Sequence, residues 1–231
     1  MTDFMHNDTL LNFHTHQIRS DPTTQTVYNA RFSDWMTLPA SQLFSLGIHP
    51  WDIHTETFDQ ELEQLEKAKP RLTAIGECGL DRLINIPLEL QKVIFKQQLQ
   101  LAERWQKPVI IHCVRAFPEL ISLVKSLHIQ VPLIVHGYNA NQEIFRQLLQ
   151  HGFYFSLGYA LLKEDSHAAK CLLKLPLERL FLETDDRDLS IQTIFARASE
   201  RLYMPVNELS NQIWGNFRQV TGLCSTGVPI Y

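Results

Sequence analysis

Short apolar runs recur along this chain of 231 residues, and helical stretches separate most of them. The runs are rich in Val, Ile, Leu and Phe and are mostly continuous rather than alternating, which is typical of parallel strands buried on both faces. We expect strands at Leu10–His14, Thr26–Arg31, Leu43–Ile48, Leu72–Gly76, Val109–His112, Leu133–His136, Phe153–Leu157 and Leu180–Glu183. Eight parallel strands that alternate with helices close into a barrel, so the sequence predicts an α/β fold of the (β/α)8 TIM-barrel type.

The segments between the strands carry the hydrophobic spacing of helices. Phe58, Leu62 and Leu65, for example, follow an i, i+4, i+7 pattern. We expect helices at Phe58–Ala68, Leu88–Trp105, Phe117–Leu127, Gln142–His151, Ser166–Leu173, Ile191–Tyr203 and Val206–Val220. The segment Phe32–Gln42 is short and contains Pro39, so the predicted barrel is slightly truncated, with the helix after strand two short or missing.

Composition restricts the remaining possibilities. The chain is 45% hydrophobic and has no internal repeat or flexible linker, so we expect residues 1–231 to form a single domain. A formal net charge of −4 excludes a basic field over the whole molecule, so a nucleic acid would have to be bound locally. The N-terminus does not resemble a signal peptide, and no apolar stretch approaches the roughly 18 residues of a membrane span. Cys78 and Cys113 lie in apolar runs as reduced thiols would, so we predict a cytoplasmic protein with no membrane contact and no obligate protein partner.

Residues that can bind a metal stand at the ends of the predicted strands. His14 and His16 are two positions apart, so on a strand they point to the same face. The full candidate set is His14, His16, Glu77, His112, His136 and Asp185. Each has an ordinary explanation when taken alone, since a single His is commonly structural and Asp185 could cap a helix. Their shared position at the carboxyl ends of successive strands favours one site, because those ends meet at one rim of a barrel.

The chemistry of this set favours two metal ions. Four imidazoles and two carboxylates exceed what one tetrahedral ion with an open position can use, but they fit two divalent ions bridged by a carboxylate and a water. Glu77 is the expected bridge; His14, His16 and Asp185 complete one ion, and the histidines that end strands five and six complete the other. Mg, Mn and Zn all accept such ligands, so the identity of the metal stays open. His49 also ends a strand and is expected to shape the rim or to contact substrate.

These residues lie in segments that resemble the TatD family of metal-dependent deoxyribonucleases, within the amidohydrolase-type barrels. The matching segments are His14-Thr15-His16, Gly47-Ile48-His49-Pro50, Gly76-Glu77-Cys78-Gly79-Leu80-Asp81, Pro108–Arg115, Val135-His136, Phe155-Ser156-Leu157-Gly158 and Leu182-Glu183-Thr184-Asp185. They occur in the order of the family, and the Gly-Glu-x-Gly-Leu-Asp and Glu-Thr-Asp segments are the most specific. Asn216-Phe217 in the final helix resembles a degenerate form of the family's C-terminal Asn motif.

The chain also departs from the family pattern. Asn12 stands where the family usually has Asp, at a position that helps to orient a ligand His. Gly137-Tyr138-Asn139 replaces the usual Cys-Phe-Ser, and Asp186-Arg187-Asp188 replaces the usual Ala-Pro-Tyr. All six candidate ligands are kept while the substrate loops differ, so the metal chemistry is better supported than the identity of the substrate.

The resemblance implies a hydrolase of phosphodiesters, in the manner of a 3′-to-5′ exonuclease. Its expected substrate is DNA, at single-stranded ends, or else a small phosphoester. Asp185 and Glu77 are the implied catalytic carboxylates, with Asp185 as the general base toward water. The predicted substrate contacts are Arg115, which is suited to grip a phosphate, together with His49 and Tyr138. Weaker candidates at the same rim are Arg82, Arg187, Trp51 and Tyr159.

Two other interpretations stay open. A hydrolase of small-molecule esters, lactones or amides uses the same barrel, but such relatives often bridge their metals with a carboxylated Lys at strand four, where this chain has Glu77. Phosphatases that begin with His-x-His tend to end in Asp-x-His, whereas Asp185 is followed here by Asp186 and Arg187. A barrel that serves only as a metal-binding scaffold is disfavoured, because it would have no reason to keep a costly cluster of polar groups.

Overall fold

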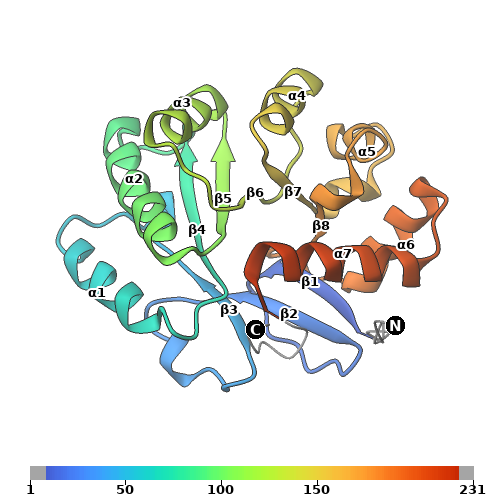
Figure 1. Cartoon of the computed structure of the whole chain (residues 1–231), viewed down its shortest axis with the longest axis horizontal. Helices are drawn as coiled ribbons and strands as arrows, with labels where there is room; N and C mark the ends of the chain where they lie inside the picture. Colours follow the sequence, from blue (N-terminus) through green and yellow to red (C-terminus); the bar gives the residue numbers. More distant parts are fainter. Residues whose placement is uncertain (1–8, 224–231) are drawn as a thin grey trace.

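The strands form a parallel barrel in chain order. The computed structural model describes residues 9–223. The strands are β1 Leu10–Thr15, β2 Thr24–Asn29, β3 Leu43–Leu46, β4 Ala74–Asp81, β5 Val109–Val114, β6 Leu133–Val135, β7 Tyr154–Leu157 and β8 Leu180–Leu182. Each pairs in parallel with the next, and an isolated bridge between Thr15 and Asp185 joins β1 to the segment that follows β8. The predicted TIM barrel is therefore confirmed, nearly closed and with eight strands (Figure 1).

Helices surround the barrel except after β2. They are α1 Phe58–Ala68, α2 Leu88–Trp105, α3 Phe117–Leu127, α4 Gln142–Gln150, α5 His167–Leu172, α6 Ile191–Leu202 and α7 Val206–Thr221. Short 3-10 turns also occur at η1 Trp35–Thr37, η2 Pro50–Asp52, η3 Tyr159–Leu162 and η4 Leu177–Arg179. The connection from β2 to β3 carries only η1, as the short segment with Pro39 predicted, and Figure 1 shows loops rather than a helix beside β2. The barrel is therefore least covered on the side of β2.

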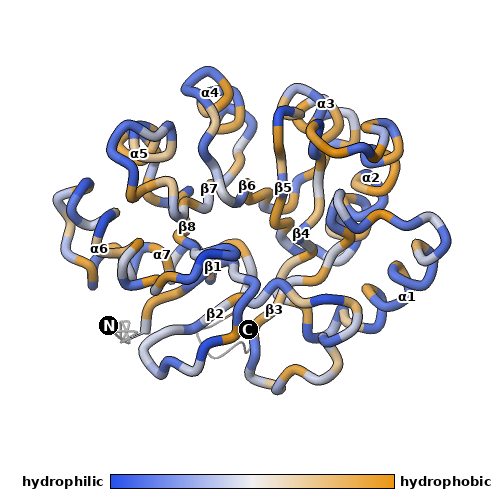
Figure 2. The backbone as a smooth tube through the Cα atoms, turned by 180° about the vertical axis from the view of Figure 1, so that it is seen from behind, coloured by the Kyte–Doolittle hydropathy of each residue, from blue (hydrophilic) through white to orange (hydrophobic). Residues whose placement is uncertain are grey.

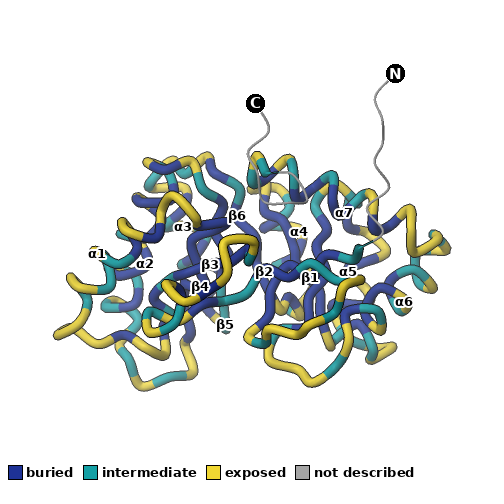
Figure 3. Tube along the Cα trace, turned by 90° about the horizontal axis from the view of Figure 1, so that it is seen from below, coloured by how far each residue is buried: buried dark blue, intermediate teal, exposed yellow. Residues whose placement is uncertain are grey.

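The core fills the barrel and the space beneath the helices. Phe13 of β1 stacks on Phe181 of β8 with ring centroids 3.9 Å apart. The helices alternate hydrophobic and hydrophilic stretches (Figure 2), and the buried residues gather along the strands (Figure 3). Asn216 of α7 is buried and donates hydrogen bonds to Leu177 O at 2.7 Å and Leu180 O at 2.8 Å, which fastens the last helix to the start of β8. None of the helices in the described part of the chain is long and apolar enough to cross a membrane.

The sheet is irregular where it carries candidate ligands. The pairing of β1 with β2 shifts register after Asn12, and that of β4 with β5 shifts after Ile75. Such irregularities bend a strand locally and redirect its side chains. Strand β4 continues to Asp81, beyond the predicted end, and lies so close to β5 that a Cβ at Gly79 (φ +149°) would be 1.9 Å from His112 O. Glycine permits this approach, which brings the end of β4 against the end of β5.

Candidate metal centre and active site

Glu77 lies at the centre of the site, and its two oxygens face different histidines. Oε2 is 3.3 Å from Nε2 of His14 and 3.3 Å from Nε2 of His16. Oε1 is 2.9 Å from Nδ1 of His112 and 2.7 Å from Nε2 of His136. The carboxylate is only 3% exposed, so it is surrounded by imidazoles rather than by water. Glu77 could therefore give one oxygen to a cation beside His14 and His16 and the other to a cation beside His112 and His136.

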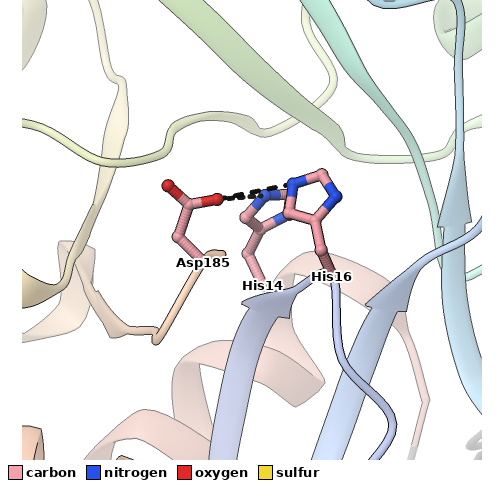
Figure 4. Close-up of side chains that lie close together, drawn as sticks. All are labelled: His14, His16 and Asp185. Atoms are coloured by element: carbon pink, nitrogen blue, oxygen red, sulfur yellow. Dashed lines mark ion pairs between the residues drawn. The ribbon is translucent and has the colours of Figure 1, made fainter. Parts of the chain in front are cut away.

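The first group of side chains consists of His14, His16 and Asp185 (Figure 4). Asp185 Oδ1 lies 3.6 Å from His14 Nε2 and 3.4 Å from His16 Nε2, and the three residues each offer a ligand atom within 4.8 Å of the others. His14 is fully buried, and neither of its ring nitrogens has a hydrogen-bond partner. A buried imidazole without a partner is costly unless something else satisfies it, so these residues fit a divalent cation.

The charges of the cluster stabilise one another. Burial alone would raise the pKa of Glu77, but the charge of His136 and the hydrogen bonds from His112 and His136 hold it well below its usual value. Hydrogen bonds to Asp185 and Glu77 raise the pKa of His16 to about 9. Burial opposes ionisation of Asp185 as well, yet the adjacent rings of His14 and His16 lower its pKa. The site thus keeps its carboxylates ionised, as metal ligands must be.

The second group is built around His112 and His136, and each of these rings is held from behind by a carboxylate. Nε2 of His112 lies 3.3 Å from Asp81 Oδ2, and Nδ1 of His136 lies 3.4 Å from Glu183 Oε1. Carboxylates in this position fix the orientation and tautomer of a ligand His. The nitrogens that face inward, Nδ1 of His112 and Nε2 of His136, are 3.5 Å apart and both point at Glu77.

His49 completes the rim, as expected for a residue that shapes it. Its Nδ1 accepts a hydrogen bond from Trp51 N at 3.1 Å, and its Nε2 lies 3.2 Å from Glu77 Oε1, so that His49, Glu77 and His112 also form a group that could hold a metal. His49 thus contacts Glu77 directly. Strand β2 supports the same residue, because Asn29 Oδ1 accepts a hydrogen bond from Glu77 N at 2.9 Å.

Asn12 ties the first and last strands together. Its Nδ2 donates to Thr184 Oγ1 at 2.8 Å, and its Oδ1 accepts from Thr184 N at 3.0 Å. Both residues are buried, and the amide uses a donor and an acceptor that an aspartate could not both provide. In this chain the replacement of the usual Asp therefore fastens β1 to the loop that carries Asp185.

A cavity of about 850 Å³ opens beside the cluster. Besides the candidate ligands other than His14, it is lined by Arg31 and Phe32 after β2 and by Trp51 after β3. Trp51 Nε1 donates to Asp81 Oδ2 at 2.7 Å, while the residue remains 60% exposed. Trp51 is therefore a fixed but open indole at the edge of the cavity, and such a ring can stack on a planar group.

Two of the predicted substrate contacts do not lie at this cavity. Tyr138 follows a left-handed turn at Gly137 (φ +54°), and its ring is 2% exposed and packs edge-to-face on Phe155 rather than facing the cavity. Arg115 has a positive φ where β5 turns toward α3, and its side chain is exposed but does not line the cavity. His49 is the predicted substrate contact that the structure does place there.

The weaker candidates divide in the same way. Arg82 forms an ion pair with Glu119, and Arg187 lies 3.3 Å from Asp186 and over the ring of Tyr159. Of these weaker candidates only Trp51 lines the cavity.

Sequence analysis missed the roles of Asp81, Glu183 and Asn29. Asp81 and Glu183 both stand in the quoted motif segments, but only the metal ligands were assigned there. Because a ligand His normally has a backing acceptor, each unassigned carboxylate of those segments could have been proposed for that place. Asn29 carried no such signal, since it lies within a predicted strand rather than beyond its end.

The fold and the cluster can now be compared with known proteins. A family model described as TatD related DNase matches residues 23–222. The chain belongs to the TatD-related DNase family. Among its relatives is an uncharacterised metal-dependent hydrolase, YjjV of Escherichia coli, which is 28% identical over 190 residues that cover 74% of this chain and 73% of the relative.

Two TatD relatives have more specific names. The deoxyribonuclease Tat-D of Schizosaccharomyces pombe is 30% identical over 156 residues, covering 61% of this chain and 50% of the relative. The 3′-5′ ssDNA/RNA exonuclease TatD of Edwardsiella piscicida is 34% identical over 146 residues, covering 60% and 55%. The matched segments thus span only about half the length of these two relatives.

Solved structures support the TatD fold. The crystal structure of Escherichia coli YjjV aligns with a TM-score of 0.80 at 22% identity, over 94% of this chain and 99% of that one. A TatD-family hydrolase from Entamoeba histolytica aligns with a TM-score of 0.75 at 16% identity, over 93% and 98%. At these identities the likeness concerns the barrel itself.

Proposed function

We propose that this member of the TatD family is a single-domain enzyme that hydrolyses phosphodiester bonds with two divalent metal ions, with DNA as its substrate and 3′-to-5′ exonuclease action. The observation that carries the proposal is that the two oxygens of Glu77 face different pairs of histidines. Oε2 faces His14 and His16, and Oε1 faces His112 and His136. The names of the exonuclease and deoxyribonuclease relatives support the substrate. The unpaired cysteines in the described residues agree with the proposed cytoplasmic location.

The proposed ligands share the work as their positions allow. His14, His16 and Asp185 would hold one ion, His112 and His136 the other, and Glu77 both. When bound, two divalent cations of this kind neutralise phosphate oxygens and lower the pKa of a water between them. We assign Mg, Mn or Zn to the site without distinguishing them, because all three accept imidazole or carboxylate ligands.

The chain's own residues supply orientation and the proton acceptor. Oδ1 of Asp185 faces the two histidines, which leaves Oδ2 to accept the proton of the attacking water. Asp81 and Glu183 keep the rings of His112 and His136 in place. Trp51 is proposed to stack on the base at a strand end, where base–aromatic stacking contributes about 1–3 kcal/mol.

The test is hydrolysis of a 5′-labelled single-stranded DNA oligomer with Mg²⁺ or Mn²⁺, with and without EDTA. Wild type should give a metal-dependent ladder, and Asp185→Asn should lower the rate by about 10²- to 10⁴-fold because it loses the general base. Asp186→Asn is the matched control, since this neighbouring carboxylate lines the same cavity but is paired with Arg187. Full activity in Asp185→Asn would refute the proposed base, and turnover of simple esters without any cleavage of DNA would move the substrate to small molecules.

A further inference from the structure

One cationic side chain other than histidine lines the cavity among the described residues, and it is Arg31. The charged groups around it are carboxylates: Asp52, Glu61, Glu77, Asp185 and Asp186. A phosphate that enters such a cavity is attracted by bound cations at the cluster and by Arg31, and is repelled elsewhere. Arg31 is therefore the place outside the metal cluster where the cavity favours an anion.

The backbone of Arg31 is held firmly at the end of β2. Its N–H donates to Asp34 Oδ1 at 2.9 Å, and its carbonyl accepts from Asp34 N at 3.1 Å and from Trp35 N at 3.2 Å. The preceding Ala30 N donates to Ser45 O of β3 at 2.9 Å. A residue fixed in this way loses little backbone freedom when its side chain binds a ligand.

The guanidinium of Arg31, in contrast, has no ion-pair partner among residues 9–223. The side chain is exposed, and no described carboxylate lies within ion-pair distance of it. Arg82 and Arg187 differ in this respect, because they are paired with Glu119 and Asp186. A free guanidinium presents a fork of N–H donors that matches two phosphate oxygens.

The position of Arg31 relative to Glu77 indicates which phosphate it can reach. Asn29 is in direct contact with Glu77 N, and the chain continues past it in the direction of β2, as the bond from Ala30 to Ser45 shows. Two residues of extended chain advance by about 7 Å. Arg31 lines the same cavity as Glu77 and Asp185, two residues beyond this contact, so it can face a phosphate next to one held at the candidate ligands.

We propose that Arg31 binds a second phosphate of the substrate, next to the scissile one, so that the enzyme prefers nucleotides with two successive phosphates over an isolated phosphodiester. This inference rests on the proposed phosphodiesterase function. Arg31 lies in the β2–β3 connection, which contains η1 instead of a helix. The side of the barrel that lacks a helix would thus contribute to substrate binding.

The test compares two dinucleotides that differ by one phosphate. Wild type, Arg31→Ala, Arg31→Lys and Arg115→Ala are assayed on pdTpdT and on dTpdT, which lacks the 5′-phosphate. Arg31→Ala should raise KM for pdTpdT about tenfold or more, as expected for a lost charge-assisted contact, with little change for dTpdT. Arg31→Lys should recover part of the loss, and Arg115→Ala should match wild type because that exposed arginine lies outside the cavity.

Binding provides a second readout that does not require turnover. A fluorescently labelled hexathymidylate with hydrolysis-resistant phosphorothioate linkages should bind Arg31→Ala about tenfold more weakly than wild type, at equal metal content. If wild type hydrolyses both dinucleotides and Arg31→Ala raises KM equally for the two, the inference about Arg31 is overturned while the proposed function stands. Failure of wild type to cleave the labelled oligomer and both dinucleotides would overturn the proposed function, whereas equal binding of the phosphorothioate strand by wild type and Arg31→Ala would overturn the inference.

Discussion

Glu183→Gln tests whether the buried carboxylate behind His136 acts through that ring. Glu183 is fully buried, its Oε1 accepts from Gly137 N at 2.6 Å and faces His136 Nδ1 at 3.4 Å, and its Oε2 has no partner. Glutamine has the same shape and keeps an oxygen for both contacts, but it removes the charge that holds the imidazole in place. Loss of such a backing carboxylate costs about 10- to 100-fold in metal affinity, or about 1.4–2.7 kcal/mol.

The fold itself should tolerate this change. The metal-free variant should stay folded but lose some stability toward urea, because Glu183 helps to hold the pKa of His136 well above its usual value against the effect of burial. Metal affinity is measured by competition with a metallochromic dye for Mn²⁺ or Zn²⁺, at a pH where both proteins are folded. Asp186→Asn serves as control, because it removes a carboxylate at the rim of the same loop. A variant that binds metal within twofold of wild type, with unchanged stability, would refute the positioning role of Glu183.

Two further predictions concern stability. Asn216→Ala leaves the buried carbonyls of Leu177 and Leu180 without their hydrogen-bond donor, so the free energy of unfolding measured in urea should fall by about 2–4 kcal/mol. Gln212→Ala is the control. It removes a half-buried side chain that hydrogen-bonds only to Asn216 among the described residues, so it should lower the free energy of unfolding far less. In chelator-treated protein the raised pKa of His16 stabilises the fold fully below about pH 6.5, and this contribution is lost as the pH rises through about 9. In EDTA, the urea concentration at the midpoint of unfolding should therefore decrease as the pH is raised from about 6.5 to about 9. A midpoint that increases over this pH range would contradict the stabilising role of the protonated ring.

The barrel, and the meeting of the candidate ligands at one rim, could be predicted because both depend on local patterns. Continuous apolar runs signal buried parallel strands, and a residue at the end of such a strand must lie at the common rim. The positions of His14 and Glu77 at the ends of predicted strands were enough to place both residues at this rim. The short connection with Pro39 likewise predicted the missing helix after β2.

The supporting contacts could not be predicted, because they depend on register and on single backbone angles. Asp81 reaches His112 only because β4 runs on beyond its predicted end and its register with β5 shifts. Tyr138 follows its strand as a rim residue would, yet one left-handed glycine before it sends the ring into the core. Arg31 was counted as the last residue of a strand, whereas β2 ends at Asn29.

The seam between β8 and β1 has a consequence for how the chain matures. It is closed by the Thr15–Asp185 bridge and by the amide of Asn12, whose partner Thr184 is 172 positions away. A chain still leaving the ribosome before Asp185 already carries every other proposed ligand, but it has neither the seam nor the residue that completes the first ion. Binding of this first ion therefore depends on closure of the barrel, and an ion held by His14, His16 and Asp185 would link β1 to the segment that follows β8.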